Sequence, residues 1–364
     1  MNEKVQDFIF VCATKAQLFN AINIKLSLYP DACADIYLCD MGTNHFSNLK
    51  KNVEQTGIFD NVFCYTMKYD TNQSFWGKLY KALYNIRDYR DMSMQLPQIN
   101  KEYDAIFISG PSSAVNMVYY NLKKRLPHLK LFLYEEGVCE YYILASNRLL
   151  ARKIYSLLFY GRYYIDDAEE LYVYDPSLVK KRHQKVLLKS IPQVSINNEK
   201  LRNALNIVFG FKKDDSFSVS EGCVMFIDQA FYREKDEICQ KKILQTLVDK
   251  VGKDKIFVKM HPGSAHNKYS GMGVHCITSN QTMEMIEFNY QLTDLTLVSV
   301  CSSALFNYKL IFGVNPNAIL LFKIFEGQKL NKQLLAFVES FIDEYKEMNI
   351  VVPTNYEDLC ERVI

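Results

Sequence analysis

Three short polar segments follow strongly apolar runs in this 364-residue chain, and they contain the residues best suited to chemistry. The acidic segment is Glu-Glu-Gly at 135–137. The histidine segment, His-Pro-Gly at 261–263, and the serine pair at 302–303 come much later in the chain. Buried strands of α/β sheets read as apolar runs, and such sheets bind ligands at the carboxyl ends of their strands. The pattern predicts a two-domain enzyme with its site in the cleft between two sheets.

Each segment offers a different chemical function. Glu135 or Glu136 can serve as a general base, because a neighbouring like charge and partial burial raise a carboxyl pKa towards neutrality. His261 can protonate a leaving phosphate or stabilise its charge. Serines at the start of a helix add hydroxyl donors to free backbone N–H groups and form an anion site. The structural alternatives are a solvated turn, a core histidine and a plain helix N-cap, respectively.

Two series of alternating strands and helices are predicted to position these segments. The first has strands near 8–13, 34–39, 61–65, 104–109, 130–134 and 171–174, and the second near 223–227, 255–260, 274–278, 295–300 and 317–322. Strands that alternate with helices favour parallel sheets with right-handed crossovers. The polar stretch 190–220 is the best linker candidate. We therefore expect an N-terminal acceptor-side domain at 1–205 and a C-terminal nucleotide-binding domain at 206–364.

Composition and missing motifs exclude several function classes. A net charge of +2 gives no argument for a nucleic-acid partner, and 49% hydrophobic residues exclude a disordered chain. No apolar stretch has the length of a membrane helix, and the N-terminus lacks the features of a signal peptide. The ten cysteines are scattered singly, which favours reduced thiols in the cytoplasm. The chain has no phosphate-binding glycine loop, no zinc-protease motif and no Asp-x-Asp after a strand, so a metal-free phosphate site fits best.

Taken in this order, the three segments resemble those of bacterial sialyltransferases, in particular glycosyltransferase family 52, the lipooligosaccharide and capsule sialyltransferases. The related bacterial polysialyltransferases share the same motifs. The resemblance extends from the first strand to about Phe322. It implies an α/β GT-B fold, with two Rossmann-like domains facing a central cleft. It also implies inverting, metal-independent transfer of N-acetylneuraminic acid from CMP-sialic acid to a terminal galactoside of a surface glycan, with no cofactor beyond that donor.

The resemblance also implies roles for individual residues. His261 is expected to help the CMP phosphate depart, and the remaining CMP contacts are expected from Pro262, Gly263, Ile277, Thr278, Glu284, Ser302 and Ser303. Among these, Ser302 and Ser303 would hold the phosphate, Glu284 the ribose, and the backbone at Ile277 and Thr278 the cytosine. The base stays open between the acidic segment and a second carboxylate. Family 52 enzymes place a carboxylate after a Gln-Pro, where this chain has Gln229-Ala230, so that Glu234 and Asp236 are both candidates.

Other readings remain open at this stage. They are a polysialyltransferase or a transferase of another CMP-activated acid sugar, a metal-dependent transferase, and a non-catalytic nucleotide- or glycan-binding scaffold. The basic, aromatic stretch 148–164 is compatible with peripheral contact with the inner face of a bacterial membrane or a glycolipid, and also with packing inside the protein. Family members can form dimers, so a homodimer stays open as well.

Overall fold

The computed structural model describes residues 6–363 apart from 41–45, 68–74, 97–98, 111, 146–149, 181–184, 214–221, 232, 262, 266, 278–280 and 293–294, and apart from the side chains of 75–84 and 151–152. The chain divides into two compact units. The first comprises Met1–Pro192 and Asn203–Gly210, and the second comprises Gln193–Arg202 and Phe211–Ile364. The domain boundary expected near residue 205 lies within a helix whose residues are divided between the two units.

The first unit is built on a seven-stranded parallel sheet in the order β3-β2-β1-β4-β5-β6-β7. Its central strand β4 is an apolar run with every residue buried, and the neighbouring β1 and β5 are buried except for their first residue, as expected where helices cover both faces of a sheet. The strands are β1 (Asp7–Cys12), β2 (Cys33–Asp40), β3 (Val62–Thr66), β4 (Ala105–Ile108), β5 (Lys130–Tyr134), β6 (Ala168–Val173) and β7 (Leu187–Ser190).

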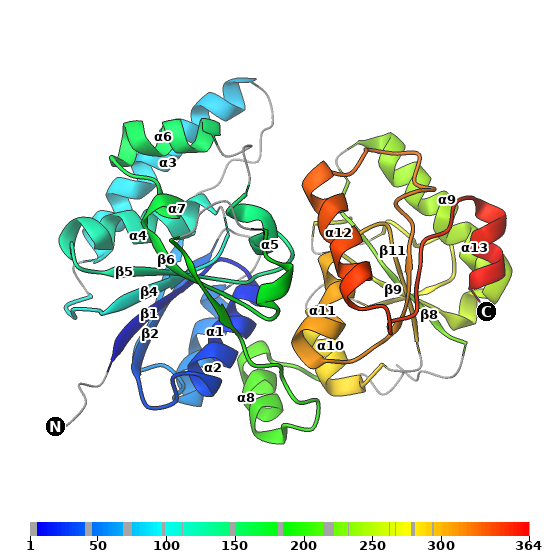
Figure 1. The fold of residues 1–364 in the computed structure, drawn as a ribbon, viewed down its shortest axis with the longest axis horizontal. Helices are drawn as coiled ribbons and strands as arrows, with labels where there is room; N and C mark the ends of the chain where they lie inside the picture. The colour runs from blue at the N-terminus through cyan, green and yellow to red at the C-terminus, as the bar shows by residue number, and fades with distance from the viewer. Residues whose placement is uncertain are drawn as a thin grey trace. The chain divides into compact units, whose positions relative to one another are not determined.

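Helices cover both faces of this sheet. Figure 1 shows α1 and α2 on one face and α3, α4, α6 and α7 on the other. The helices of the unit are α1 (Lys15–Ser27), α2 (Phe46–Thr56), α3 (Phe75–Gln95), α4 (Ser113–Arg125), α5 (Glu140–Ile143), α6 (Leu150–Tyr160), α7 (Tyr164–Asp167) and most of α8 (Glu199–Phe209). From β1 the chain adds β2 and β3 at one side of the sheet, and β4 to β7 are then added at the other side. The strand order therefore reverses between β1 and β4.

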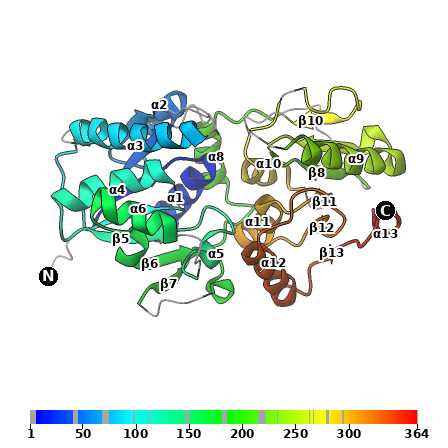
Figure 2. The same cartoon turned by 90° about the horizontal axis from the view of Figure 1, so that it is seen from above.

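The second unit repeats this plan with a six-stranded parallel sheet in the order β10-β9-β8-β11-β12-β13. Figures 1 and 2 show α9 and α13 together on one side of it and α10, α11 and α12 on the other. The strands are β8 (Val224–Ile227), β9 (Ile256–Lys259), β10 (His275–Ile277), β11 (Thr296–Ser299), β12 (Asn317–Leu320) and β13 (Ile350–Val351). The helices are α9 (Glu234–Val251), α10 (Met283–Tyr290), α11 (Ser303–Phe312), α12 (Lys332–Glu344) and α13 (Tyr356–Arg362). Here the strand order reverses between β8 and β11.

Each unit has a hydrophobic core of its own. In the first, Phe10 stacks on Phe107 across neighbouring strands with ring centroids 4.4 Å apart, and Tyr134 packs edge-on against Phe10. In the second, residues of β8, β9, β11 and β12 pack against Ile243, Leu244 and Leu247 of α9. Fully buried aromatic and branched side chains provide most of the apolar burial that stabilises such units.

The two Rossmann-like α/β halves predicted from the sequence are confirmed. The sequence patterns did not predict β7, α8, β13 or α13, which are short or lie in polar surroundings. In the part of the chain that the structure describes, no helix combines the length and hydrophobicity needed to cross a bilayer.

Candidate functional site

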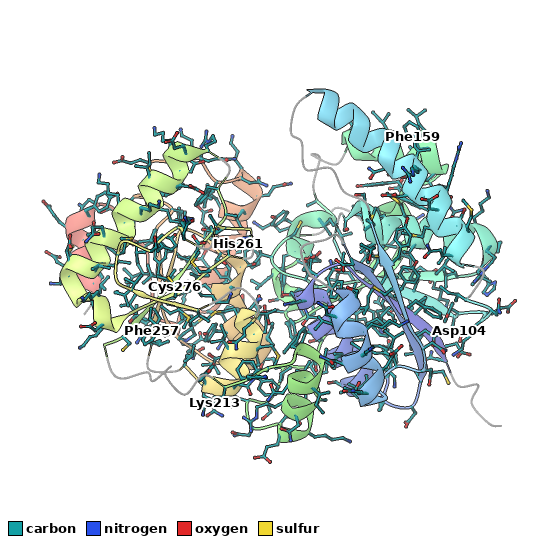
Figure 3. The ribbon with its side chains drawn as sticks, turned by 180° about the vertical axis from the view of Figure 1, so that it is seen from behind. Asp104, Phe159, Lys213, Phe257, His261 and Cys276 are labelled. Atoms are coloured by element: carbon teal, nitrogen blue, oxygen red, sulfur yellow. The ribbon has the colours of Figure 1, made fainter. Side chains whose placement is uncertain are left out.

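The predicted segments lie at the carboxyl ends of the strands where each sheet reverses its order. In the first unit, residues after β1, β4 and β5 meet around the acidic segment. In the second unit, residues after β8, β9 and β11 surround the histidine segment and the serine pair. Figure 3 shows His261 beyond the end of β9, whereas Phe257 lies near the start of that strand. Such reversal points are where open α/β sheets bind ligands.

Glu135 is a buried part of the first unit. Its Oε2 accepts hydrogen bonds from the Tyr141 hydroxyl at 2.6 Å and from the Tyr174 backbone N–H at 2.9 Å. Its carbonyl accepts a bond from Asn20 Nδ2 at 2.7 Å. The side chain is 1% exposed, and this burial raises the pKa of Glu135 to about 8 against the opposing effect of its two donors. At neutral pH this carboxyl is mostly protonated, and it ties the acidic segment to β6.

Glu136 is oriented by side chains of α1. Thr14 Oγ1, at the N-cap of α1, donates to Glu136 Oε1 at 2.7 Å, and Gln17 Nε2 donates to Glu136 Oε2 at 2.6 Å. Gln17 is itself fixed, because its Oε1 accepts the Ala13 N–H at 2.6 Å. Glu136 is half-buried, so part of its side chain is open to solvent. Both of these donors are neutral, and they hold the carboxylate in one orientation.

Glu140 is a third carboxyl of this cluster, and the sequence analysis did not single it out. Its Oε2 accepts the backbone N–H groups of Glu136 and Gly137, each at 3.3 Å, and its Oε1 accepts the Ser109 hydroxyl at 3.3 Å. Burial, followed by the charge of Glu136, raises the pKa of Glu140 to about 8. A Cβ at Gly110 would lie 3.4 Å from both Glu136 Oε2 and Glu140 Oε1, so this positive-φ glycine leaves space between the two carboxyls.

His261 is the exposed residue that follows β9, and its ring has a defined hydrogen-bonding state. Its Nδ1 accepts the Gly263 N–H at 2.9 Å, which leaves Nε2 as the N–H donor of the neutral imidazole. The backbone N–H of His261 donates to Asp228 Oδ2 at 3.1 Å. Although the ring reaches solvent, protein atoms around it remove part of its hydration and lower the pKa of His261, with Lys259 and Lys268 acting in the same direction and Asp228 against it.

The serine pair sits in a turn that is fixed by hydrogen bonds from two strands. Ser302 is the N-cap of α11, where its Oγ accepts the Ala304 N–H at 3.3 Å, and its own N–H donates to Ser299 Oγ at 3.0 Å. Gln229, just after β8, accepts the Cys301 N–H at 2.9 Å and donates to the Cys301 carbonyl at 3.3 Å. These bonds hold the turn across the reversal point of the sheet, between β8 and β11.

Ser303 is the first residue of α11. It is half-buried, and no hydrogen bond of its side chain is present within the described parts of the chain. As the first residue of a ten-residue helix, it lies where the partial positive charge of the helix dipole is concentrated. Ser303 therefore adds a hydroxyl without a partner in the described structure, and the Ser302 hydroxyl, which accepts a bond, also keeps its proton for a bound anion.

Glu284 lies in the first turn of α10 and is buried, with 7% of its surface exposed. Its Oε1 accepts Asn307 Nδ2 at 2.7 Å, so it joins α10 to α11. Ile277 ends β10 and is half-buried. Pro262 and Thr278, which were also predicted to contact CMP, lie outside the described residues.

The two other carboxylates considered as the base lie at the start of α9. Glu234 is exposed. Asp236 is 0% exposed and forms a two-point ion pair with Arg233, from Nε at 2.8 Å and from Nη2 at 2.9 Å, while its Oδ1 also accepts the Gln328 N–H at 2.8 Å. The Arg233 guanidinium, the largest of these influences, lowers the pKa of Asp236. Asp236 thus anchors the start of the helix.

Comparison with known families decides the class of the protein. The alpha-2,8-polysialyltransferase family matches residues 68–320 of this chain, which includes the acidic segment, the histidine segment and the serine pair. The chain belongs to the alpha-2,8-polysialyltransferase family. It is therefore a glycosyltransferase of the sialyltransferase class, and the resemblance to bacterial sialyltransferases related to the polysialyltransferases is confirmed. The search of curated protein sequences returned no match.

Solved structures of low sequence identity share the fold. An alpha/beta-galactoside alpha-2,3-sialyltransferase from the luminous marine bacterium Photobacterium phosphoreum aligns with a TM-score of 0.54 and 11% identity, over 96% of this chain and 99% of that one. A UDP-glucosyltransferase from Polygonum tinctorium gives 0.58 and 9%, over 100% and 90%. A UDP-N-acetylglucosamine 2-epimerase gives 0.52 and 10%, over 98% and 86%. At these identities the likeness shows the fold alone, and that fold is the predicted GT-B fold.

For this polysialyltransferase family member, the sequence singled out the three polar segments but not the residues that hydrogen-bond to them. Gln17 and Asp228 are distant in sequence from Glu136 and His261, and only the sheet topology brings them together, whereas Glu140 lies four residues after Glu136. One signal was visible in advance. Thr14 directly follows the first apolar run and is a residue type that favours a helix N-cap, and residues after neighbouring parallel strands meet at the same sheet edge.

Proposed function

We propose that this sialyltransferase moves sialic acid from CMP-sialic acid to a glycan hydroxyl in one direct displacement, with inversion and without a metal ion in the chemical step. The observation that carries this proposal is the kind of residue found at the two reversal points. One holds an oriented carboxylate, Glu136, and the other holds neutral donors, His261 and Ser303. A proton acceptor and a phosphate-binding set are the two things that such a displacement needs.

Glu136 is the proposed base. A base must reach the acceptor hydroxyl and must remain basic, and Glu136 is partly open to solvent with two neutral donors that orient it. Glu135 is 1% exposed, so its carboxyl is closed to an acceptor hydroxyl. Asp236 is committed to Arg233, and Glu234 lies exposed at a helix start. The structure therefore supports Glu136 over the three other carboxylates considered.

His261 and Ser303 are the proposed phosphate contacts. With Nδ1 occupied as an acceptor, His261 presents Nε2–H to a phosphate oxygen as a neutral donor. A lowered pKa keeps the imidazole neutral at pH 7, so it acts by stabilising the departing CMP rather than as a fully ionised acid. Ser303 adds a hydroxyl and the N-terminus of α11 adds backbone N–H groups.

The proposed transfer forms one bond and breaks one bond, and these residue roles account for the proton and the leaving group. The acceptor oxygen forms a bond to the anomeric carbon of sialic acid as the bond between that carbon and the phosphate oxygen breaks. The electron pair of the broken bond leaves with CMP, and the hydroxyl proton passes to Glu136. Charge develops on the sugar in an oxocarbenium-like transition state and on the phosphate that departs. Donors aimed at the phosphate stabilise that charge as it appears.

The acceptor we propose is a glycan that already ends in sialic acid. Family membership supports it over the terminal galactoside expected from the sequence. The test is to incubate the purified protein with CMP-sialic acid and two matched acceptors, one ending in galactose and one in sialic acid, and to measure released CMP and product. Transfer to the sialylated acceptor supports the proposal. Transfer to the galactoside alone would replace the acceptor, and intact CMP-sialic acid with both would refute sialyl transfer from this donor.

Metal independence and a nucleotide-sugar donor are tested in the same assay. Full activity in EDTA supports the metal-free chemistry, whereas activity restored only by a divalent cation would overturn it. Structural neighbours include glycosyltransferases crystallised with UDP, which supports the use of a nucleotide-bound donor by this fold. The choice of CMP over UDP is checked by competition of each nucleotide against the transfer reaction.

We further propose that α6 contacts the surface that carries the acceptor. One face of α6 exposes four large apolar residues, Leu150 (64%), Ile154 (51%), Leu157 (44%) and Leu158 (77%). Phe159, labelled in Figure 3, is also exposed. The stretch between Glu140 and Asp166 contains basic residues and no acid. An apolar helix face within a basic segment suits an anionic bilayer surface. Flotation with anionic and neutral vesicles checks this, since Leu158→Glu should abolish binding if α6 is the contact.

A further inference from the structure

A buried ion pair lies beneath the His261 loop, in a part of the second unit that no predicted role uses. Asp228, the residue after β8, is 2% exposed and accepts three hydrogen bonds. Its Oδ1 accepts Lys268 Nζ at 2.7 Å and the Tyr269 hydroxyl at 2.6 Å, and its Oδ2 accepts the His261 N–H at 3.1 Å. One carboxylate therefore binds both His261, near the start of the connection between β9 and β10, and two residues further along it.

Lys268 is almost completely enclosed. The side chains of the pair are 2% exposed for Lys268 and 0% exposed for Asp228. Lys268 Nζ also donates to Gln240 Oε1 of α9 at 2.7 Å and to the Gln229 carbonyl at 3.3 Å. An ammonium group buried this deeply loses its hydration, and full pairing is what makes such burial tolerable. Burial of a lysine ammonium costs free energy that an apolar side chain of similar size would not, which suggests a specific role for Lys268.

The contacts of this network converge on the elements that hold the phosphate site. Asp228 fixes the backbone of His261, and the next residue, Gln229, fixes the Cys301 backbone in the serine turn. Lys268 also donates to the Gln229 carbonyl, so it contacts the end of β8, where both Asp228 and Gln229 lie. The buried pair therefore sets the position of the imidazole relative to the start of α11 within this unit.

We infer that Asp228 and Lys268 clamp the backbone of His261 to the segment Lys268–Tyr269 and that Lys268 is a positioning residue for His261, an inference that rests on the proposed role of His261 in sialyl transfer. Lys268 does not touch the phosphate. It holds Asp228, and Asp228 holds the backbone from which the imidazole projects. A displacement of about 1 Å in a catalytic group can lower a rate about 100-fold, so loosening this loop should affect turnover more than binding.

The central variant is Lys268→Met, which keeps the length of the stem and removes the charge. We expect kcat to fall about 10- to 100-fold with the KM for the acceptor unchanged, because the proposed acceptor contact, Glu136, belongs to the first unit. Lys268→Met also leaves Asp228 as a buried, unpaired charge, so its unfolding temperature should fall. The double variant Asp228→Asn/Lys268→Met removes both charges. It should recover most of the unfolding temperature while kcat stays low.

The matched control is Lys309→Met. Lys309 is a largely buried lysine of the same unit, 14% exposed, and forms an ion pair with Glu347 at 2.7 Å near the end of α11. It should change stability without changing kcat per folded molecule. A double variant with wild-type kcat, or an equal kcat loss in Lys309→Met, would overturn the clamp and leave Lys268 with a purely structural role.

A readout without turnover separates this inference from the proposed function. Imidazole nitrogen NMR of the wild-type protein should show His261 as the neutral form protonated at Nε2, because Gly263 donates to Nδ1. Lys268→Met should shift this signal toward a mixture of both neutral forms, whereas Lys309→Met should not. If the wild-type protein fails to use CMP-sialic acid, the proposed function fails while this spectrum still tests the clamp. An unchanged spectrum in Lys268→Met would refute it.

Discussion

Buried carboxyls have different bonding partners at the two reversal points of the sheets. In the first unit, Glu135 and Glu140 are buried with tyrosine, serine and backbone donors, and the pKa of each is raised to about 8. In the second unit, Asp228 is buried to the same degree and is bonded to the ammonium of Lys268. A cation beside the acidic segment would hold a carboxylate in its ionised form and weaken it as a base. Under the proposed mechanism, the first site moves a proton and the second holds His261 in place.

Replacing each of the two adjacent glutamates in turn tests the proposed role of the first site. Glu136→Gln should lower kcat by about 10²- to 10⁴-fold, because an amide cannot accept the acceptor proton. Glu135→Gln removes a carboxyl that is already mostly protonated, so kcat per folded molecule should change little. Initial rates of CMP release measure both. A larger loss in Glu135→Gln than in Glu136→Gln would reverse the assignment of the base.

Removing the imidazole tests the proposed role of His261. His261→Ala should lower kcat by about 10²-fold or more, because the departing phosphate loses a donor aimed at its developing charge. The control is His275→Ala, an exposed histidine of β10 in the same unit whose ring packs on Phe257. Steady-state kinetics with CMP-sialic acid compare the two. Near-normal turnover in His261→Ala would remove this residue from the mechanism.

The two serines should separate binding from stability. Ser303→Ala should lower kcat/KM for the donor up to about tenfold, which corresponds to one net hydrogen bond of about 0.5–1.5 kcal/mol. Ser302→Ala should instead destabilise the second unit by about 1 kcal/mol, since its Oγ caps α11. Kinetics and denaturant unfolding distinguish these outcomes. Equal kinetic effects of the two variants would show that both hydroxyls contact the phosphate.

The buried carboxyls of Glu135 and Glu140 in the first unit should also make the free energy of unfolding depend on pH. Glu135 and Glu140 change from a pKa of 4.5 to about 8 on folding, so between these values the folded state binds more protons than the unfolded state. The free energy of unfolding must then fall as pH rises across this range and level off above it. Unfolding temperatures at pH 5, 6.5 and 8 measure the slope. Glu140→Gln should reduce the slope, and Glu169→Gln, at an exposed position on β6, should not.

Much of the fold was predictable from the sequence for a physical reason. Central parallel strands such as Ala105–Ile108 and Val224–Ile227 are buried on both faces, so they appear as uninterrupted apolar runs. Edge strands such as Ile350–Val351 are short and half-buried, and their sequences carry no such signal. The helix Glu199–Phe209 lies in a polar stretch that reads as a linker, although its packing contacts stabilise it.

The candidate site was predictable only in part. Glu136, His261 and Ser303 follow apolar runs, so their place at the ends of strands could be read directly. The choice between Glu135 and Glu136 could not, because it depends on Tyr141, Tyr174, Thr14 and Gln17, which come from other parts of the chain. The same holds for Lys268, whose ammonium is bonded by residues of two other segments, Asp228 and Gln229 after β8 and Gln240 of α9.

The course of the backbone around α8 has a practical result for dissecting this enzyme. The chain passes between the units three times, after Pro192, after Arg202 and after Gly210, and the second passage occurs inside a helix. A fragment ending at Pro192 would lose the Val208 carbonyl that Asn52 binds at 3.2 Å. No single cut yields two intact pieces, so fragments made separately should misfold or recombine only when both are present.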